Sequence, residues 1–426
     1  MTANSATEGT GSASPGTDNR PRGAVWVGIS SAVASVAGVV IMFVASHALS
    51  PADNAEFLSF WAALFLVSGL LGGVQTEATR AISEVSHRAV QRSGALVLSA
   101  ALTIGGAAAA VLLLLSPILT TVVFKKDAWT SIVCLTVTAL LFPVHAALSG
   151  SLQGQRQWDR FGQLVSLEST LRLIGVAAAA LMGASLGGVE VACLTALLAW
   201  MSFVLASRRA RASLRVRTSL GLRALLGNMG HALLSAASSA ALVVGFPILL
   251  KLTTSAQDYA LTAPLLLAVS LTRAPIMIPL QSFQGVAIAH VVRNPDEGWR
   301  ALLKPLVWVA GIGLAGTVLA WFIGPPLMLI FGPAYVISPW VVSSLTFAAA
   351  LMAILTLLGT AVISLGHHAA FSTGWIVATA VCVGVLLLPL GTDLRTVLSL
   401  TLGPLCGIAI HALSLGARRR GIVRAS

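Results

Sequence analysis

The sequence predicts an all-α integral membrane protein, and three observations support that prediction. Of the 426 residues, 57% are hydrophobic and 9% are charged, whereas a soluble domain carries roughly 25% charged residues. Apolar stretches of about 20 residues, the length that crosses a bilayer as a helix, recur along the chain. Aromatic residues make up only 6% while glycines number 39, which favours closely packed helices over a β-barrel with aromatic girdles.

A hydropathy window of about 19 residues predicts about twelve transmembrane helices. In the first half their expected limits are 25–46, 56–75, 93–115, 129–150, 162–184 and 187–207. In the second half they are 224–250, 259–289, 304–331, 337–363, 370–390 and 394–416. Every gap between spans is shorter than a span, so no loop is large enough to form a soluble domain that could act alone.

The charges between the spans predict the orientation. Twenty basic residues fall on the side of the N-terminus: Arg20, Arg22, Arg80, Arg88, Arg92, Arg156, Arg160, Arg208, Arg209, Arg211, Arg215, Arg217, Arg223, Arg293, Arg300, Lys304, Arg418, Arg419, Arg420 and Arg424. The other side holds Lys125, Lys126, Lys251 and Arg395. Because cytoplasmic loops are enriched in Lys and Arg, we expect a multi-pass protein of the cytoplasmic (inner) membrane with both termini in the cytoplasm.

Composition and symmetry predict the domain organisation. The expected parts are a disordered cytoplasmic tail at 1–22, an N-lobe at 23–207, a basic linker at 208–223, a C-lobe at 224–417 and a basic tail at 418–426. A signal peptide is disfavoured because the first apolar run exceeds the usual 7–15 residues, roughly. A shift of 204 positions places Ser31 on Ser235 and Ser35 on Ser239, which suggests an internal repeat with six helices per half.

Four stretches carry a resemblance to a known family. The segment ALSPADNAEF is similar to a Leu-Ser-Pro-Ala-Glu-Tyr-Gly turn before the second helix, although Asn54 replaces its aromatic residue and Ala55 its glycine. The segment QTEATRAISE resembles the family's Glu-x-x-x-Arg ending of the second helix. The segment LQGQRQWDRFG resembles a Gly-x-x-Arg-Phe turn, in looser spacing. The segment FGPAY, which SLGHH follows, resembles a Phe-Gly-x-x-Tyr turn. Together they resemble the multidrug/oligosaccharidyl-lipid/polysaccharide (MOP) exporter superfamily, in particular its polysaccharide transporter branch, the lipid-linked oligosaccharide flippases.

The resemblance implies two six-helix lobes around a central cavity that opens alternately to each face. The implied cargo is a polyprenyl-diphosphate-linked oligosaccharide or a related anionic cell-envelope precursor. The implied partners are this lipid-linked glycan, membrane lipids, and envelope glycosyltransferases or a polymerase.

Charged residues inside predicted spans are candidate site residues, because burying a charge in the bilayer costs at least about 2.5 kcal/mol. Arg273 lies near the middle of the eighth span beside Pro275 and Pro279. A guanidinium there could bind a diphosphate or acidic sugar, or it could satisfy the carbonyls that the prolines leave free. Arg172 follows Glu168 by one turn in the fifth span, which suits either an internal ion pair or a cavity-facing pair that exchanges partners with an anionic substrate.

Other candidates lie at the ends of spans. Glu77 and Arg80 share one face at the end of the second span, as an interfacial ion pair or a gate at the cavity mouth. A polar stripe on the seventh span predicts that this face borders a cavity or another helix; it comprises Asn228, His231, Ser235 and Ser238 or Ser239. Weaker candidates are His145, Gln163, Gln281 and Gln284.

The remaining polar residues are given structural interpretations. Lys125, Lys126, Lys251 and Asp393 are expected to be solvated loop charges, and His411 to serve packing. The four cysteines, which form no CxxC pair, are likewise expected to pack in the core: Cys134, Cys193, Cys382 and Cys406.

Three alternatives to a flippase stay open. A cation-coupled multidrug exporter needs unpaired carboxylates in its lobes, whereas only Glu168 is clearly inside a span. A major-facilitator carrier would have a Gly-x-x-x-Asp-Arg-x-Gly loop after its second span, where this chain has TEATRAISEVSHRAVQR. A non-transporting scaffold for envelope assembly is the third. We expect no enzyme activity, no cofactor, no metal site and no nucleic-acid partner, because the sequence holds no catalytic or ligand constellation and no continuous basic face.

Overall fold

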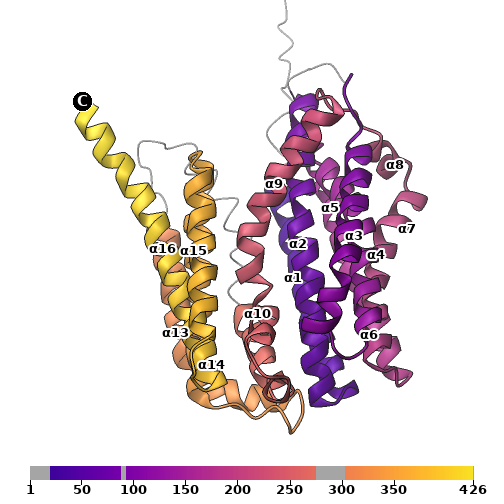
Figure 1. Cartoon of the computed structure of the whole chain (residues 1–426). Helices are drawn as coiled ribbons and strands as arrows, with labels where there is room; N and C mark the ends of the chain where they lie inside the picture. The colour runs from indigo at the N-terminus through magenta and orange to yellow at the C-terminus, as the bar shows by residue number, and fades with distance from the viewer. Residues whose placement is uncertain (1–19, 88–92, 275–302, 426) are drawn as a thin grey trace, which may run out of the picture.

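The computed structural model describes residues 20–87, 93–274 and 303–425 (Figure 1). The first half comprises α1 (Arg20–Ala48), α2 (Pro51–His87), α3 (Val97–Val122), α4 (Ala128–Gly154), α5 (Trp158–Leu181), α6 (Leu186–Ala192), the 3₁₀ helix η1 (Cys193–Leu197), α7 (Leu198–Ala206) and α8 (Arg208–Leu214). The second half comprises α9 (Leu222–Val243), α10 (Phe246–Leu252), α11 (Ala256–Tyr259), a helix at Ala263–Ala274, α13 (Leu303–Leu329), α14 (Pro339–Ser364), α15 (His368–Leu386) and α16 (Thr392–Ala425).

The predicted fold class is confirmed. Within the described ranges, ten helices are long and apolar enough to cross a membrane, and the number is eleven when the bent pair α9–α10 is counted as one span. The predicted eighth span, 259–289, lies partly outside the described residues. The chain is therefore a multi-pass membrane protein.

The helices form two groups that approach each other at one end (Figure 1). In the first group α1 packs on α5, and α2 and α3 pack on α4; in the second, α13 packs on α14, and α15 and α14 pack on α16. α9 runs between the groups and contacts both α2 and α15. The end at which α2 and α16 terminate, at the top of Figure 1, is called the basic end. The end at which both helices begin, and at which the two groups converge, is called the opposite end.

α2 extends well beyond its predicted limits of 56–75 and comprises 37 residues. Its last turns carry Glu77, Arg80 and Glu84, whose charges end the apolar window without ending the helix. Arg80 bonds Glu77 at 2.6 Å and Glu84 at 3.3 Å, at i,i+3 and i,i+4 spacing. Such pairs at i,i+3 and i,i+4 spacing stabilise a helix, so α2 continues past the end of the apolar window.

The seventh span is broken, which hydropathy alone did not predict. α9 ends at Val243 and α10 starts at Phe246, with a bend of 66° between their axes. Pro247 occupies the first turn of α10, where its missing amide hydrogen costs nothing, whereas inside a continuous helix its ring would clash with the preceding turn. The break frees carbonyl oxygens, and the Val243 carbonyl accepts a hydrogen bond from Arg273 Nη1 at 2.7 Å.

Small residues set how closely α2 and α9 approach. A Cβ on Gly73 would lie 2.5 Å from the Leu233 backbone nitrogen, so only glycine fits there. Its neighbour Gly72 would meet nothing within 4 Å. The α2–α9 contact therefore depends on one specific glycine, as expected for close helix packing in membranes.

The two halves start corresponding helices with the same cap. The Ser50 hydroxyl accepts from the Asp53 amide at 3.2 Å, and the Ser255 hydroxyl accepts from the Asp258 amide at 3.2 Å. Each serine hydroxyl also donates to the aspartate carboxylate, at 2.9 and 2.7 Å. These equivalent pairs are 205 positions apart, so the cap matches with an offset one residue longer than the 204 positions suggested by the sequence.

Candidate functional site

A cavity of about 600 Å³ lies between the two helix groups. Its wall is formed by residues of α2, α4, α5, α9, α14 and α15, and it reaches Phe161 and Phe371 near the starts of α5 and α15 at the basic end. One side of the wall is polar, with Gln75, Ser149 and the charged residues of α5. The other side is largely apolar, with Val243 and Trp375 among its residues, and aromatic rings line both sides of the cavity. A volume of this size suits a small-molecule or headgroup site.

The polar wall contains a three-residue cluster. Glu168 accepts a hydrogen bond from Arg172 Nη2 at 2.5 Å, and His145 Nε2 lies 3.3 Å from its second carboxylate oxygen. The side chains of His145, Arg172 and Glu168 are 6%, 13% and 18% exposed, so the cluster lies largely out of water. The predicted pairing of Glu168 with Arg172 is thus formed, and it lies in the cavity wall.

Arg172 keeps part of its donor capacity. Its guanidinium lies over the ring of Phe65 at 5.1 Å and near that of Trp61 at 5.9 Å. Its Nε is buried and has no hydrogen-bond partner among the described residues. A buried unpaired donor of this kind costs about 1–3 kcal/mol.

Arg273 lies at the break in the seventh span rather than in the described cavity lining. Besides its bond to the Val243 carbonyl, its guanidinium lies 5.8 Å from the Phe246 ring centroid. Val243 itself lines the cavity. Arg273 therefore contacts the cavity wall only from behind, through Val243 at the break. Its neighbours Pro275 and Pro279 lie outside the described residues.

The candidates at the basic end join α2 to α9. Glu77 is 7% exposed at its side chain and accepts from Arg80 and, at 3.1 Å, from Asn228 of α9. This bond brings together three predicted site residues from the two halves of the chain. His231 is exposed, and Ser235 is partly buried with its carbonyl bonded to Ser238. None of these five lines the described part of the cavity, whereas Ser239, two turns beyond His231, does.

Sequence reasoning missed two buried charges. Lys251, interpreted as a solvated loop charge, has a side chain only 6% exposed and forms an ion pair with Glu56 of α2. Glu190 is 1% exposed and accepts from Ser131 at 2.8 Å, so Glu168 is not the only carboxylate inside a span. The partners lie 195 and 59 positions away, and no local pattern signals them.

The other predicted loop charges at this end are exposed. Lys126 pairs with Asp53, and this carboxylate raises the pKa of the Lys126 ammonium group. The four cysteines are free and wholly or partly buried, as expected for packing residues.

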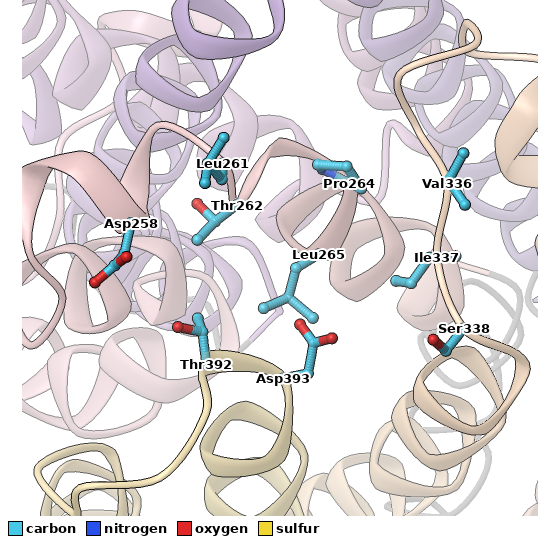
Figure 2. A pocket seen from close by; sticks show the side chains of 10 residues that line it. All are labelled: Asp258, Leu261, Thr262, Pro264, Leu265, Val336, Ile337, Ser338, Thr392 and Asp393. Atoms are coloured by element: carbon cyan, nitrogen blue, oxygen red, sulfur yellow. The ribbon is translucent and has the colours of Figure 1, made fainter.

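A second, smaller cavity of about 330 Å³ lies at the opposite end within the C-terminal half (Figure 2). Asp258, Asp393, Thr262, Ser338 and Thr392 give it an acidic, hydroxyl-bearing lining, completed by five apolar residues. In Figure 2 the Asp393 carboxylate points between Leu265 and Ser338, whereas Asp258 lies at the edge of the group. This cavity is separate from the cluster around Glu168.

Comparison with curated proteins identifies close relatives. The chain is 36% identical over 394 residues to the uncharacterized protein Rv1510 of Mycobacterium tuberculosis strain H37Rv, covering 92% of this chain and 91% of that protein. It is 34% identical over 392 residues to the uncharacterized proteins Rv3630 of the same strain and Mb3654 of Mycobacterium bovis, covering 91% of each chain. A scan of protein families found no match.

Solved structures share the fold at low sequence identity. A MOP-superfamily transporter from Pyrococcus furiosus aligns with a TM-score of 0.69 and 15% identity over 93% of this chain and 96% of that one. Inward-facing and outward-facing structures of a multidrug resistance MATE family transporter of that superfamily give TM-scores of 0.68 and 0.67. The chain therefore belongs to the family of Rv1510 and Rv3630, and it is a multi-pass membrane protein with the fold of the MOP-superfamily transporters.

Proposed function

We propose that this protein is a transporter that moves an amphipathic cargo across the membrane by alternating access. The observation that carries the proposal is the cavity between the two helix groups, which charged residues of the first group and aromatic residues of both groups line together. A cargo with a polar headgroup and an apolar part would match both kinds of lining. The fold shared with MOP-superfamily transporters supports this function.

The proposed cargo is a polyprenyl-diphosphate-linked oligosaccharide or a related anionic envelope precursor. Arg172 would bind the diphosphate, because it lines the cavity and its guanidinium fork suits phosphate oxygens. Glu168 would remain with His145, which already lies 3.3 Å from its carboxylate. Arg273 would act behind the wall by holding the seventh span in its broken form.

The remaining candidates would act at the basic end. Glu77, Arg80 and Asn228 would form the contact that controls entry to the cavity, since they link α2 to α9 there. We propose that this end faces the cytoplasm, which the positive-inside bias favours. Envelope glycosyltransferases on that side would then supply the cargo.

A cation-coupled multidrug exporter is a second candidate, and one observation favours it. Glu190 and Glu168 are both carboxylates inside spans, whereas an anion transporter needs none. Phe65, Phe371 and Trp375 in the cavity wall would also suit a cationic aromatic drug.

Reconstitution of the full chain in proteoliposomes separates the two candidates. Transbilayer movement of polyprenyl-diphosphate-linked N-acetylglucosamine would be followed by enzymatic labelling of the outer leaflet, and efflux of a lipophilic cationic dye would be measured in parallel. We expect movement of the lipid-linked sugar above that in protein-free liposomes, and no dye efflux. Dye efflux without movement of the sugar would support the exporter. The absence of both activities would contradict transport of either cargo class.

A further inference from the structure

Three polar contacts join the first turns of α2 to the second half of the chain at the opposite end. Asn54 Nδ2 donates to the Tyr335 hydroxyl at 2.6 Å, in the turn between α13 and α14. Ser59 is hydrogen-bonded to the Tyr259 hydroxyl of α11. Glu56 forms an ion pair with Lys251 of α10. One short segment of α2 therefore contacts three separate elements of the other half.

An apolar seal accompanies these contacts. Ala55 and Leu58 of α2 are 0% and 2% exposed, and they belong to a core cluster that otherwise consists of second-half residues such as Phe246, Tyr259 and Tyr335. The cavity lining described above starts only at Phe65, further along α2 toward the basic end. The segment 54–59 thus separates the cavity from the opposite face of the membrane.

The chemistry of these contacts suits a structure with two states. Lys251 Nζ lies 5.8 Å from the Phe124 ring centroid and 5.1 Å from the Tyr259 ring centroid, and its side chain is only 6% exposed. Separating a buried ion pair halfway leaves two desolvated charges, whereas full separation returns both to water. The contact therefore favours fully closed or fully open over any intermediate. Burial also raises the pKa of the Tyr335 hydroxyl, which keeps it protonated as a hydrogen-bonding group.

We propose that Asn54, Glu56 and Ser59 of α2, with Tyr335, Lys251 and Tyr259, form a gate that closes the cavity toward the opposite end, with the Glu56–Lys251 pair as its main lock. This inference rests on the proposed transport function but names the device that alternates access. Asp53 lies in the same turn of α2 as Glu56, but its partner Lys126 lies between α3 and α4, so both residues of this pair belong to the first half. It supplies a matched control, because breaking it removes an ion pair without separating the two halves.

The test measures accessibility and requires no cargo. Ser68 lines the cavity, and a Ser68→Cys reporter would be labelled with a membrane-impermeant maleimide applied from the side of the opposite end. Labelling of a separate Lys126→Cys variant identifies that side, because the Lys126 side chain is 58% exposed. The chain without the introduced cysteine gives the background from Cys406 and the buried native cysteines.

We expect Glu56→Gln to raise the labelling rate of the reporter at least about fivefold, the low end of typical couplings between conformational states. Asp53→Asn should leave the rate unchanged, and the exchange of charges in Glu56→Lys with Lys251→Glu should return it to the parent value. If Glu56→Gln fails to accumulate in the membrane, the Tyr335→Phe variant, which keeps the ring, tests the gate instead. We expect it also to raise the labelling rate of the reporter.

Parent labelling rates in both Glu56→Gln and Tyr335→Phe would overturn the gate, as would an equal increase in Asp53→Asn. Because the readout is labelling of a cavity residue, a failed gate and a failed cargo assignment give different results. A chain with cargo transport but no labelling response has another gate, and a chain with the labelling response but no transport has another cargo.

Discussion

Glu168 of α5 lies between Arg172, one turn further along the same helix, and His145 of α4. The Arg172 bond is 2.5 Å and the His145 nitrogen is 3.3 Å from the carboxylate. The acid precedes the base by four residues, the favourable order within a helix. The pair lines the cavity, so the same contact that lets two charges lie inside the membrane also keeps a guanidinium beside the proposed cargo.

Replacement of Arg172 by methionine tests whether this guanidinium binds cargo. We expect Arg172→Met to abolish transport of the lipid-linked sugar and to destabilise the protein by about 3 kcal/mol, because Glu168 loses its main partner. The double variant Glu168→Gln with Arg172→Met should recover stability, since no unpaired charge remains, without recovering transport. Thermal unfolding in detergent and the proteoliposome assay measure the two effects. Transport by the double variant would show that the pair serves only structure.

Arg273 should be needed for transport because it supports the broken seventh span through the Val243 carbonyl. Arg273→Ala is expected to abolish transport while the protein still accumulates in the membrane, and Arg273→Lys to recover only part, because an ammonium group lacks the planar fork. Both variants would be assayed in proteoliposomes at matched protein content. Full activity of the alanine variant would remove Arg273 from the mechanism.

Arg395 provides the matched control for Arg273. Its guanidinium also donates to backbone carbonyls, of Thr253 at 2.9 Å and Leu386 at 3.2 Å, but at the opposite end and away from the cavity lining. We expect Arg395→Ala to lower the thermal midpoint and to leave transport per folded molecule unchanged. An equal loss of transport in both alanine variants would indicate a general effect on folding.

Two adjacent glycines of α2 should respond differently to alanine. Gly73→Ala would place a Cβ 2.5 Å from the Leu233 backbone nitrogen, and we expect a destabilisation of about 1–3 kcal/mol, typical of overpacking. Gly72→Ala meets nothing within 4 Å and should be neutral or stabilise by up to about 1 kcal/mol through helix propensity. Thermal midpoints of the purified variants measure the difference. Equal midpoints would contradict the described α2–α9 contact.

The Glu77–Asn228 contact predicts a charge-dependent effect at the basic end. Asn228→Asp would place a second carboxylate about where the amide now donates to Glu77 at 3.1 Å. Like charges at a largely buried position repel, so we expect a lower thermal midpoint than for Asn228→Ser. Adding Glu77→Gln should reverse the loss, and this double-mutant cycle isolates the pair. Additive effects of the two substitutions would mean that the side chains do not interact.

The sequence predicted the membrane-spanning helices well, because a hydropathy window detects the long apolar stretches that a bilayer requires of them. The predicted tenth span, 337–363, differs from α14 by two residues at its start and one at its end. The pairing of Glu168 with Arg172 was also predictable, because both residues lie on one helix at i,i+4 spacing. Such features depend on nearby residues, so a local pattern reveals them.

Features that depend on distant residues were not predictable. Lys251 looked like a loop charge because its partner Glu56 comes from the second span. The break before Phe246 is a different case: Gly245 and Pro247 mark it locally, but a hydropathy window does not register them. His145 was only a weak candidate because α4 alone does not show that Glu168 of α5 lies beside it. The one-residue difference in the cap offset likewise required the observed Ser255–Asp258 bond.

The central claim, that the cavity recognises an anionic headgroup through Arg172, is tested most directly by ligand-induced stabilisation of the purified full chain. The thermal midpoint would be measured with polyprenyl diphosphate and with the uncharged polyprenol of the same length; a ligand at 100 times its Kd adds about 2.7 kcal/mol. We predict a higher midpoint with the diphosphate only, and loss of this shift in the Glu168→Gln, Arg172→Met double variant. Equal shifts with both lipids, or an unchanged shift in the double variant, would contradict the claim.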